Sequence, residues 1–257
     1  MANARSGRGG YRFALQAEAP GMRRLQGHPD LGIMAPLRAN AHRRARGEAV
    51  ERKPVMKLYY SPGACSLSPH IALCEAGMKF ELVKAVLQTH TLADGSDYYQ
   101  VTAKGQVPLL ELDDGTRLSE GPAILQYIAD HAPASGLAPA AGTMERYRVM
   151  EWLNFVTSEL HKGFSPLFNP KMPQEAKEIF AARLKDKFAW VDSKLEGSDY
   201  LMGKKFSIAD CYLFTISNWA AGLGIDLSGF KNVEAYRVRM AARPAVQDAM
   251  KAEGLLK

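Results

Sequence analysis

Residues 56–70 read MKLYYSPGACSLSPH and combine the pattern of a strand, turn-forming residues and the start of a helix. Lys57–Tyr60 has the β-propensity of a short strand, and Ser61–Ala64 is rich in turn-forming residues. A helix is predicted from Cys65 to Ala76, because Gly77 stands where a helix of this length takes a C-terminal cap. The stretch therefore predicts a strand, a tight turn and a helix, with Cys65 in the first helical turn.

Residues 132–142 are rich in Ala, Pro and Gly and are predicted to be a linker between two regions of regular structure. Before the linker we expect strands and one helix, at residues 80–86, 107–112, 116–118 and 122–131. After it we expect only helices, at residues 144–167, 173–195 and 207–223, with two shorter ones flanking Pro244. The predicted fold class is therefore α/β plus all-α, with domains at residues 56–134 and 143–257.

Residues 1–55 differ from the rest of the chain and are predicted to be a disordered basic extension. They hold 11 Lys and Arg against 4 Asp and Glu, whereas the remainder holds 22 against 23. Three explanations stay open: an upstream translation artefact with Met56 as the working start, a targeting segment, or a tail that binds nucleic acid or a partner. We favour the artefact, because a strand is predicted immediately after Met56. We expect no nucleic-acid partner, because the positive charge lies outside the predicted folded body.

Composition excludes several further classes of protein. The chain is 47% hydrophobic and 23% charged, which is ordinary for a globular protein, and it has no apolar run long enough for a membrane span. Its three cysteines, Cys65, Cys74 and Cys211, are too few for a disulfide framework and lack the spacing of a zinc site. We therefore expect no metal, no membrane association and a reducing, cytoplasmic compartment.

Cys65 is the leading chemical candidate. At a helix start the unpaired N–H groups and the helix dipole favour a negative charge, so the pKa of its thiol is expected to be lowered. Ser68 stands where a dithiol site would have its second cysteine, so the expected chemistry is a monothiol that forms mixed disulfides. The alternative is that Cys65 is a small buried apolar residue.

Two further motifs suit recognition of a short peptide. A cis bond between Val107 and Pro108 would leave Val107 free to pair with an extended peptide, while a trans bond would be an ordinary strand start. Glu120 and Gly121, with Gly121 as N-cap of the next helix, suit the ammonium and carboxylate of an amino-acid head group. The plain alternative for Glu120 is favourable electrostatics at a helix start.

On the long helix that begins near Met144, polar residues are expected to share one side. They are Asn154, Ser158, His161 and Lys162. A single histidine in such a cluster is more often structural than functional.

These residues together resemble the bacterial beta-class glutathione transferases. The similarity lies in residues 56–70, in Lys104–Leu109 leading to Glu120, and in Glu151–Phe155 followed by His161. The run Phe206–Asp210 resembles the family's capping segment, in which Ser207 and Asp210 are folding residues. The resemblance covers residues 56–257.

The resemblance implies a thioredoxin-like N-terminal domain, a helical-bundle C-terminal domain and a homodimer. It implies glutathione as co-substrate, a hydrophobic electrophile as second substrate, and conjugation beside thiol–disulfide exchange through Cys65. Cys65 and His161 would be catalytic. The implied glutathione-binding residues are Tyr60, Cys65, Ser66, His90, Val107, Pro108, Glu120, Gly121, Asn154, Ser158, His161 and Lys162.

The chain departs from the family pattern at two of these positions. His90 stands where the family often has a lysine directed at the glycyl carboxylate, so we expect firmer binding as the pH falls. Gly121 stands where many transferases have serine, which removes a hydroxyl contact. A non-catalytic protein that binds glutathione or hydrophobic ligands remains the alternative function, since a fold does not fix an activity.

Overall fold

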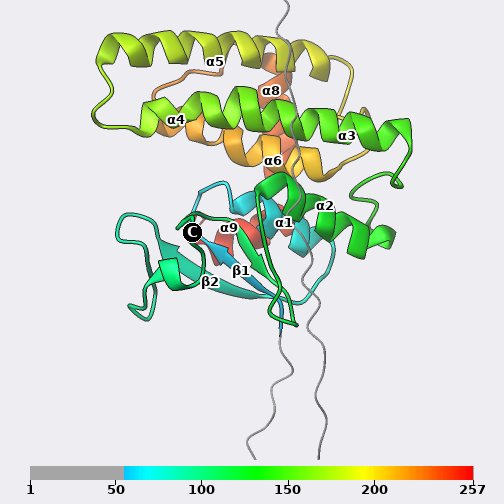
Figure 1. The fold of residues 1–257 in the computed structure, drawn as a ribbon. Coiled ribbons are helices and arrows are strands. Elements are labelled where there is room, and N and C mark those ends of the chain that lie inside the picture. The colour runs from blue at the N-terminus through cyan, green and yellow to red at the C-terminus, as the bar shows by residue number, and fades with distance from the viewer. Residues whose placement is uncertain (1–54, 257) are drawn as a thin grey trace, which may run out of the picture. The chain divides into compact units, whose positions relative to one another are not determined.

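The computed structural model of the protein describes residues 55–256 (Figure 1). The predictions for the basic extension lie outside the described residues, apart from Val55. Within the described range, residues 57–131 hold all the strands and form the strand-containing segment, and residues 144–252 form the helical segment. This order confirms the predicted fold class.

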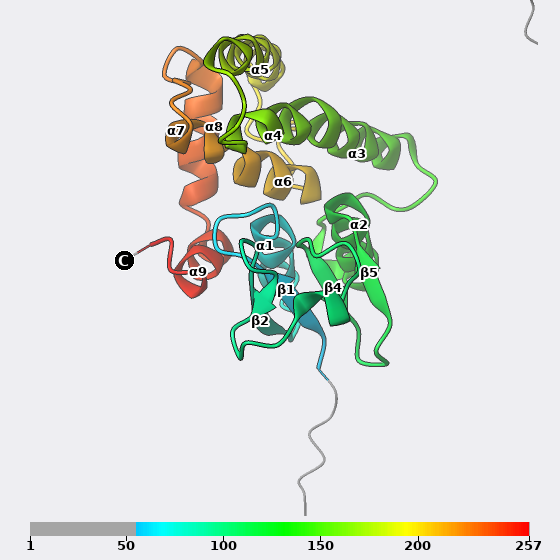
Figure 2. The ribbon, with the colours of Figure 1, turned by 60° about the vertical axis from the view of Figure 1, so that its left-hand side comes forward.

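Five strands form one mixed sheet in the order β3-β2-β1-β4-β5. The strands are β1 (Lys57–Tyr60), β2 (Glu81–Val86), β3 (Thr91–Leu92), β4 (Leu109–Glu111) and β5 (Arg117–Ser119). β1 and β2 are parallel and are connected through α1 (Leu67–Glu75), whereas the other neighbours are antiparallel. α1 and α2 (Gly121–His131) cover the same face of the sheet (Figure 2).

The two faces of the sheet belong to different hydrophobic clusters, because successive side chains on a strand alternate. Leu58 and Leu110 face the helices and join the large core. Tyr59 and Leu109 face the other way and form a smaller core with Tyr98. Tyr98 begins the short 3-10 helix η1 (Tyr98–Gln100), which therefore closes the face of the sheet opposite α1 and α2.

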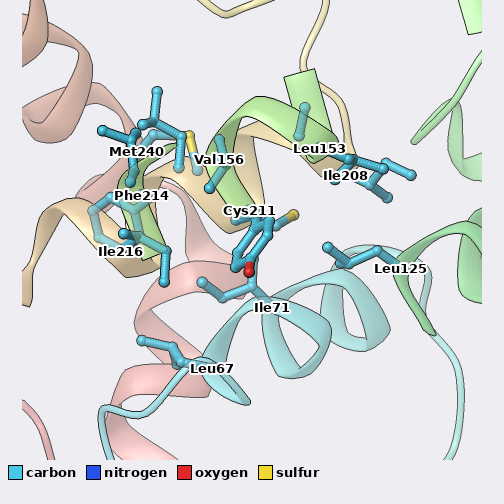
Figure 3. Close-up of a cluster of buried hydrophobic side chains, with 14 of the residues drawn as sticks. Leu67, Ile71, Leu125, Leu153, Val156, Ile208, Cys211, Phe214, Ile216 and Met240 are labelled. Atoms are coloured by element: carbon cyan, nitrogen blue, oxygen red, sulfur yellow. The ribbon is translucent and has the colours of Figure 1, made fainter. Parts of the chain in front are cut away.

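The helical segment packs on α1 and α2 through one continuous core. Figure 3 shows Leu67 and Ile71 of α1 beneath Cys211 and Phe214 of α6, with Leu125 of α2 at the side. The elements are α3 (Met144–Phe155), the π-helical segment η3 (Val156–His161), α4 (Lys162–Phe168), α5 (Gln174–Leu195), α6 (Ile208–Ser217), α7 (Trp219–Gly222), α8 (Lys231–Ala241) and α9 (Pro244–Ala252). None of the helices in the described range has the length and apolar character needed to cross a bilayer.

Three predicted boundaries need correction. The first helix begins at Leu67, because i→i−3 bonds from Leu67 to Ala64 and from Ser68 to Cys65 make a tight turn ahead of it. The helix predicted over residues 144–167 is interrupted by η3, and the one over residues 207–223 is split near Asn218. The capping box of Ser207 and Asp210 is present as predicted.

Candidate functional site

A cavity of about 590 Å³ opens between the strand-containing segment and the helical segment. Its walls include eight of the twelve predicted site residues: Cys65, His90, Val107, Pro108, Glu120, Gly121, His161 and Lys162. The other four, Tyr60, Ser66, Asn154 and Ser158, do not line it. The described residues contain no cluster of three or more His, Cys, Asp or Glu side chains that could hold a metal ion.

The thiol of Cys65 lies against the backbone of Val107, and its Sγ donates a hydrogen bond of 3.3 Å to the Val107 carbonyl. Burial raises the pKa of this thiol to about 11, although the N–H groups of Cys65 and Ser66 and the charge of Lys162 act in the opposite direction. The expected lowering of the pKa is therefore wrong, because burial outweighs the turn amides. Cys65 is a neutral thiol near neutral pH and serves as a hydrogen-bond donor.

Two residues from the C-terminal part of the chain, Trp219 and Glu253, hold the loop that carries Cys65. Trp219 Nε1 donates 2.8 Å to the Gly63 carbonyl, and the Gly63 amide donates 2.9 Å to the buried carboxylate of Glu253. The other carboxylate oxygen of Glu253 lies 2.9 Å from Nδ1 of the buried His70. These contacts join residues far apart in sequence, which is why sequence reasoning missed Trp219 and Glu253.

Tyr60 and Ser66 lie behind this loop. The hydroxyl of Ser66 accepts from the Ser61 amide at 3.2 Å and donates to the Ser61 carbonyl at 3.3 Å, so it closes the turn that precedes Cys65. Tyr60 is buried at the end of β1. Ser66 therefore supports the position of Cys65 from outside the cavity, whereas Tyr60 packs against the ring of His70.

Three consecutive carbonyls in the segment before β4 each accept a hydrogen bond from a side chain. The Gly105 carbonyl accepts from His90 Nδ1 at 3.1 Å, the Gln106 carbonyl from the Tyr98 hydroxyl at 3.0 Å, and the Val107 carbonyl from Cys65. The Val107–Pro108 bond is cis, which settles the alternative left open above. The Val107 amide has no hydrogen-bond acceptor within residues 55–256 and remains available to a ligand.

Glu120 stands at the start of α2 in a backbone conformation rare for a side chain other than glycine, with φ of +73°. Such a residue costs about 1–3 kcal/mol and is often retained at functional sites. A hydrogen bond of 2.6 Å from Lys104 Nζ lowers the pKa of its carboxyl, so Glu120 is charged at neutral pH. Glu120, and not Gly121 as predicted, is the N-cap, because α2 begins one residue early.

The helical wall of the cavity differs from the predicted stripe. From η3 and α4 it is lined by a stripe of Thr157, His161, Ser165 and Phe168, at spacings of four, four and three, and by Lys162 beside that stripe. Asn154 and Ser158 lie off this stripe: the Ser158 hydroxyl donates to the Asn154 carbonyl and lines a separate, smaller cavity. The π-helical turn of η3 is wider than an α-helical turn, so it changes which side chains face the strand-containing segment.

His161 and Tyr212 form a neutral pair on this wall. Nδ1 of His161 and the Tyr212 hydroxyl are 2.6 Å apart. Burial lowers the pKa of His161 to about 4 and raises that of the Tyr212 phenol, so neither is charged at neutral pH. Tyr212 was missed because it lies within the buried and largely apolar helix α6, where a tyrosine gives no signal of function.

The mouth of the cavity beyond His161 is aromatic. Trp219 packs edge-on against His161 and Phe168, with ring centroids 4.9 Å and 5.3 Å apart. Phe168 is itself half exposed. The cavity thus combines a polar side, with backbone groups and the Glu120 carboxylate, and an apolar side, and Cys65 and His161 lie among its lining residues.

Two family models match the chain. The model described as glutathione S-transferase, N-terminal domain, matches residues 54–130, and the model described as glutathione S-transferase, C-terminal domain, matches residues 155–244.

The chain is similar to glutathione S-transferase GstA of Escherichia coli O157:H7, with 48% identity over 200 residues that cover 78% of this chain and all of that protein. Among solved structures it is similar to a sphingomonad glutathione S-transferase complexed with glutathione, with 50% identity and a TM-score of 0.75. It is also similar to a beta-class glutathione S-transferase of Sphingomonas chungbukensis, with 48% identity and a TM-score of 0.76. Each structure is covered completely and covers 78% of this chain.

Proposed function

This chain belongs to the glutathione S-transferase family, and on that premise we propose that Cys65, Val107, Glu120 and His161 bind glutathione and activate its sulfur. The chain is a glutathione transferase with glutathione as co-substrate, and its resemblance to the bacterial beta class is confirmed. The non-catalytic alternative is set aside, because relatives of high identity are transferases.

In the proposed complex, the extended backbone of glutathione pairs with Val107, whose amide has no other acceptor within the described range. The γ-glutamyl end lies at Glu120 and the N-terminus of α2, where a carboxylate and free amides match an ammonium and a carboxylate. His90 lies on the cavity wall and takes the glycyl carboxylate. The sulfur then lies toward Cys65 and His161.

Neutral donors would stabilise the glutathione thiolate in this position. The thiol of Cys65 is protonated at neutral pH and would turn its S–H from the Val107 carbonyl to the glutathione sulfur, and the pair of His161 and Tyr212 supplies another uncharged donor. The glutathione S–H bond breaks and its proton passes to solvent. The thiolate then forms an S–C bond with the electrophile, whose leaving group departs with its electron pair.

The observation that carries this proposal is the contact of Cys65 Sγ with the Val107 carbonyl inside the cavity. A residue that recognises the cysteinyl backbone and a residue that faces the cysteinyl sulfur should be neighbours, and they are 3.3 Å apart. The raised pKa of Cys65 favours conjugation as the main activity and makes thiol–disulfide exchange through Cys65 the slower one.

Further parts of the proposal concern partners and compartment. The aromatic mouth formed by Phe168 and Trp219 suits a hydrophobic electrophile. The resemblance to the beta class supports a homodimer, and Met144 and Tyr147 are large, exposed side chains on α3 that a partner subunit would cover. All three cysteines are free, which supports a reducing, cytoplasmic compartment.

The test compares Cys65→Ala with Cys74→Ala in two assays, conjugation of an activated aryl chloride and reduction of a glutathione mixed disulfide. Cys74 is the matched control, because burial also raises the pKa of its thiol to about 11, yet it does not line the cavity. We expect Cys65→Ala to abolish disulfide reduction and to retain measurable conjugation, while Cys74→Ala changes neither. Equal loss of both activities in Cys65→Ala would contradict this division of roles.

A further inference from the structure

Tyr98 lies outside the cavity, but its hydroxyl contacts the recognition segment, residues 105–107, to which the proposed function assigns the glutathione backbone. Its side chain is fully buried in the smaller core, with its ring 5.7 Å from that of Tyr59. Its hydroxyl donates a hydrogen bond of 3.0 Å to the carbonyl of Gln106. Gln106 and Val107 line the cavity, and Tyr98 does not.

The hydrogen bond to Gln106 fixes the direction of the Val107 amide. A peptide unit is planar, and in its trans form the C=O and the following N–H point in opposite directions. The cis bond among the described residues is Val107–Pro108, so the Gln106–Val107 unit is trans. Because Tyr98 holds the Gln106 carbonyl toward the smaller core, the Val107 N–H points away from that core and toward the cavity.

We propose that Tyr98 is a positioning residue for glutathione recognition, acting through the Gln106–Val107 peptide unit. This inference rests on the proposed function, in which the Val107 amide pairs with the glutathione backbone. Without the hydroxyl, the Gln106 carbonyl loses its donor, and the peptide unit turns to find another. The Val107 amide then loses the orientation that a ligand needs.

The loss is expected to be local. The carbonyls on either side, of Gly105 and Val107, keep their own donors from His90 and Cys65. Removing one hydroxyl also leaves the ring of Tyr98 packed on Tyr59. Tyr98→Phe should therefore fold, and should change glutathione affinity more than the chemical step.

Tyr236 provides a matched control elsewhere in the molecule. It is likewise fully buried, and its hydroxyl donates 3.0 Å to the carbonyl of Asp210. Tyr236 lies in α8 and does not line the cavity. Tyr98→Phe and Tyr236→Phe therefore remove the same group from the same kind of bond, but only the first bond holds the recognition segment.

The experiment measures the dissociation constant of S-methylglutathione by calorimetry, together with KM for glutathione, kcat and melting temperature. We expect both variants to melt about 2–4 °C lower. Tyr98→Phe should raise the dissociation constant and KM by about five- to tenfold, the worth of one net hydrogen bond, and leave kcat within about twofold. Tyr236→Phe should leave all three unchanged.

A dissociation constant for Tyr98→Phe equal to that of the wild type would overturn the inference and reduce Tyr98 to a packing residue. Equal rises of the dissociation constant in Tyr98→Phe and Tyr236→Phe would overturn it as well, because a general loss of stability would explain them. If the wild type does not bind S-methylglutathione, the proposed glutathione site fails and the inference fails with it. The amide NMR signal of Val107 gives a second reading: it should shift on binding in the wild type and shift less in Tyr98→Phe.

Discussion

The two walls of the cavity are built from different materials. The wall of the strand-containing segment offers backbone groups as well as side chains: the turn before Cys65, the Val107 amide, and the start of α2. The helical wall is made of side chains, among them His161, Tyr212 and Trp219. Turn residues and helix starts predict where the backbone groups lie, whereas the positions of side chains on the helical wall depend on the register of its helices. The first wall is accordingly suited to recognition, and the second to the sulfur and the electrophile.

The largest expected effect concerns the thiol where the two walls meet. Burial raises the pKa of Cys65 from an ordinary value of 9.0 to about 11. Alkylation by iodoacetamide at pH 7.5 should therefore run about a hundredfold more slowly than for a free cysteine, and its rate should keep rising up to about pH 11. The measurement is a pH series read by peptide mass spectrometry. A plateau above pH 8 would show that the turn amides outweigh burial after all.

The next effect tests how the backbone wall is held. Glu253→Ala removes the acceptor for the half-buried Gly63 amide and leaves the buried His70 without its partner. The free energy of unfolding should fall by about 3 kcal/mol, measured by urea denaturation. Glu253→Gln keeps one carbonyl acceptor and should lose less. A fall under about 1 kcal/mol in Glu253→Ala would mean that Trp219 alone fixes the loop.

Gly105, in the segment before β4, and Gly95 differ in the space that they leave for a side chain. At Gly105, with φ of +58°, an added Cβ would lie 2.6 Å from Tyr99 and 2.8 Å from His90. At Gly95, with φ of +85°, it would meet nothing within 4 Å. Gly105→Ala should therefore cost about 2 kcal/mol more stability than Gly95→Ala and weaken glutathione binding, because His90 is displaced. Equal losses of stability, with glutathione affinity retained in both, would show that the segment adjusts freely.

The smallest effect belongs to the side-chain wall. Tyr212→Phe removes the hydroxyl that lies 2.6 Å from His161 Nδ1. We expect kcat for conjugation to fall about fivefold with KM for glutathione unchanged, the reverse of the split expected for Tyr98→Phe. Because the pKa of His161 is lowered to about 4, kcat should show no His161 titration between pH 6 and 8. A break in that range would mean that His161 is charged in the complex.

The same contrast explains how much could be predicted from the sequence. Lys57–Tyr60 and the turn after it are local features, because the residues that make them are adjacent in the chain, whereas the residues around Pro108 left the choice between a cis and a trans bond open. Of the polar side chains predicted to share one side of the long helix, His161 and Lys162 line the cavity and Asn154 and Ser158 do not, since nothing in residues 156–161 indicates a π-helical turn. The pKa of Cys65 was misjudged because a sequence gives the helix start but not the burial.

Residues that act on the cavity through another residue could not be predicted either, because the sequence does not show burial or long-range contacts. Glu253 and Tyr98 hold the backbone wall from behind, through single hydrogen bonds to Gly63 and Gln106. Glutamate near a chain end and tyrosine in an irregular stretch are common, so neither carries a signal. The resemblance to the family supplied the remaining positions, and eight of its twelve residues line the cavity.

In the proposed complex Cys65 faces the glutathione sulfur, and the intact mass after treatment with glutathione disulfide measures this placement. Cys65 should gain one glutathionyl group that reductant removes, faster as the pH rises, and Cys65→Ala should gain none at this site. An adduct on Cys74 alone, or none at any pH up to about 11 in folded protein that binds glutathione, would contradict the claim.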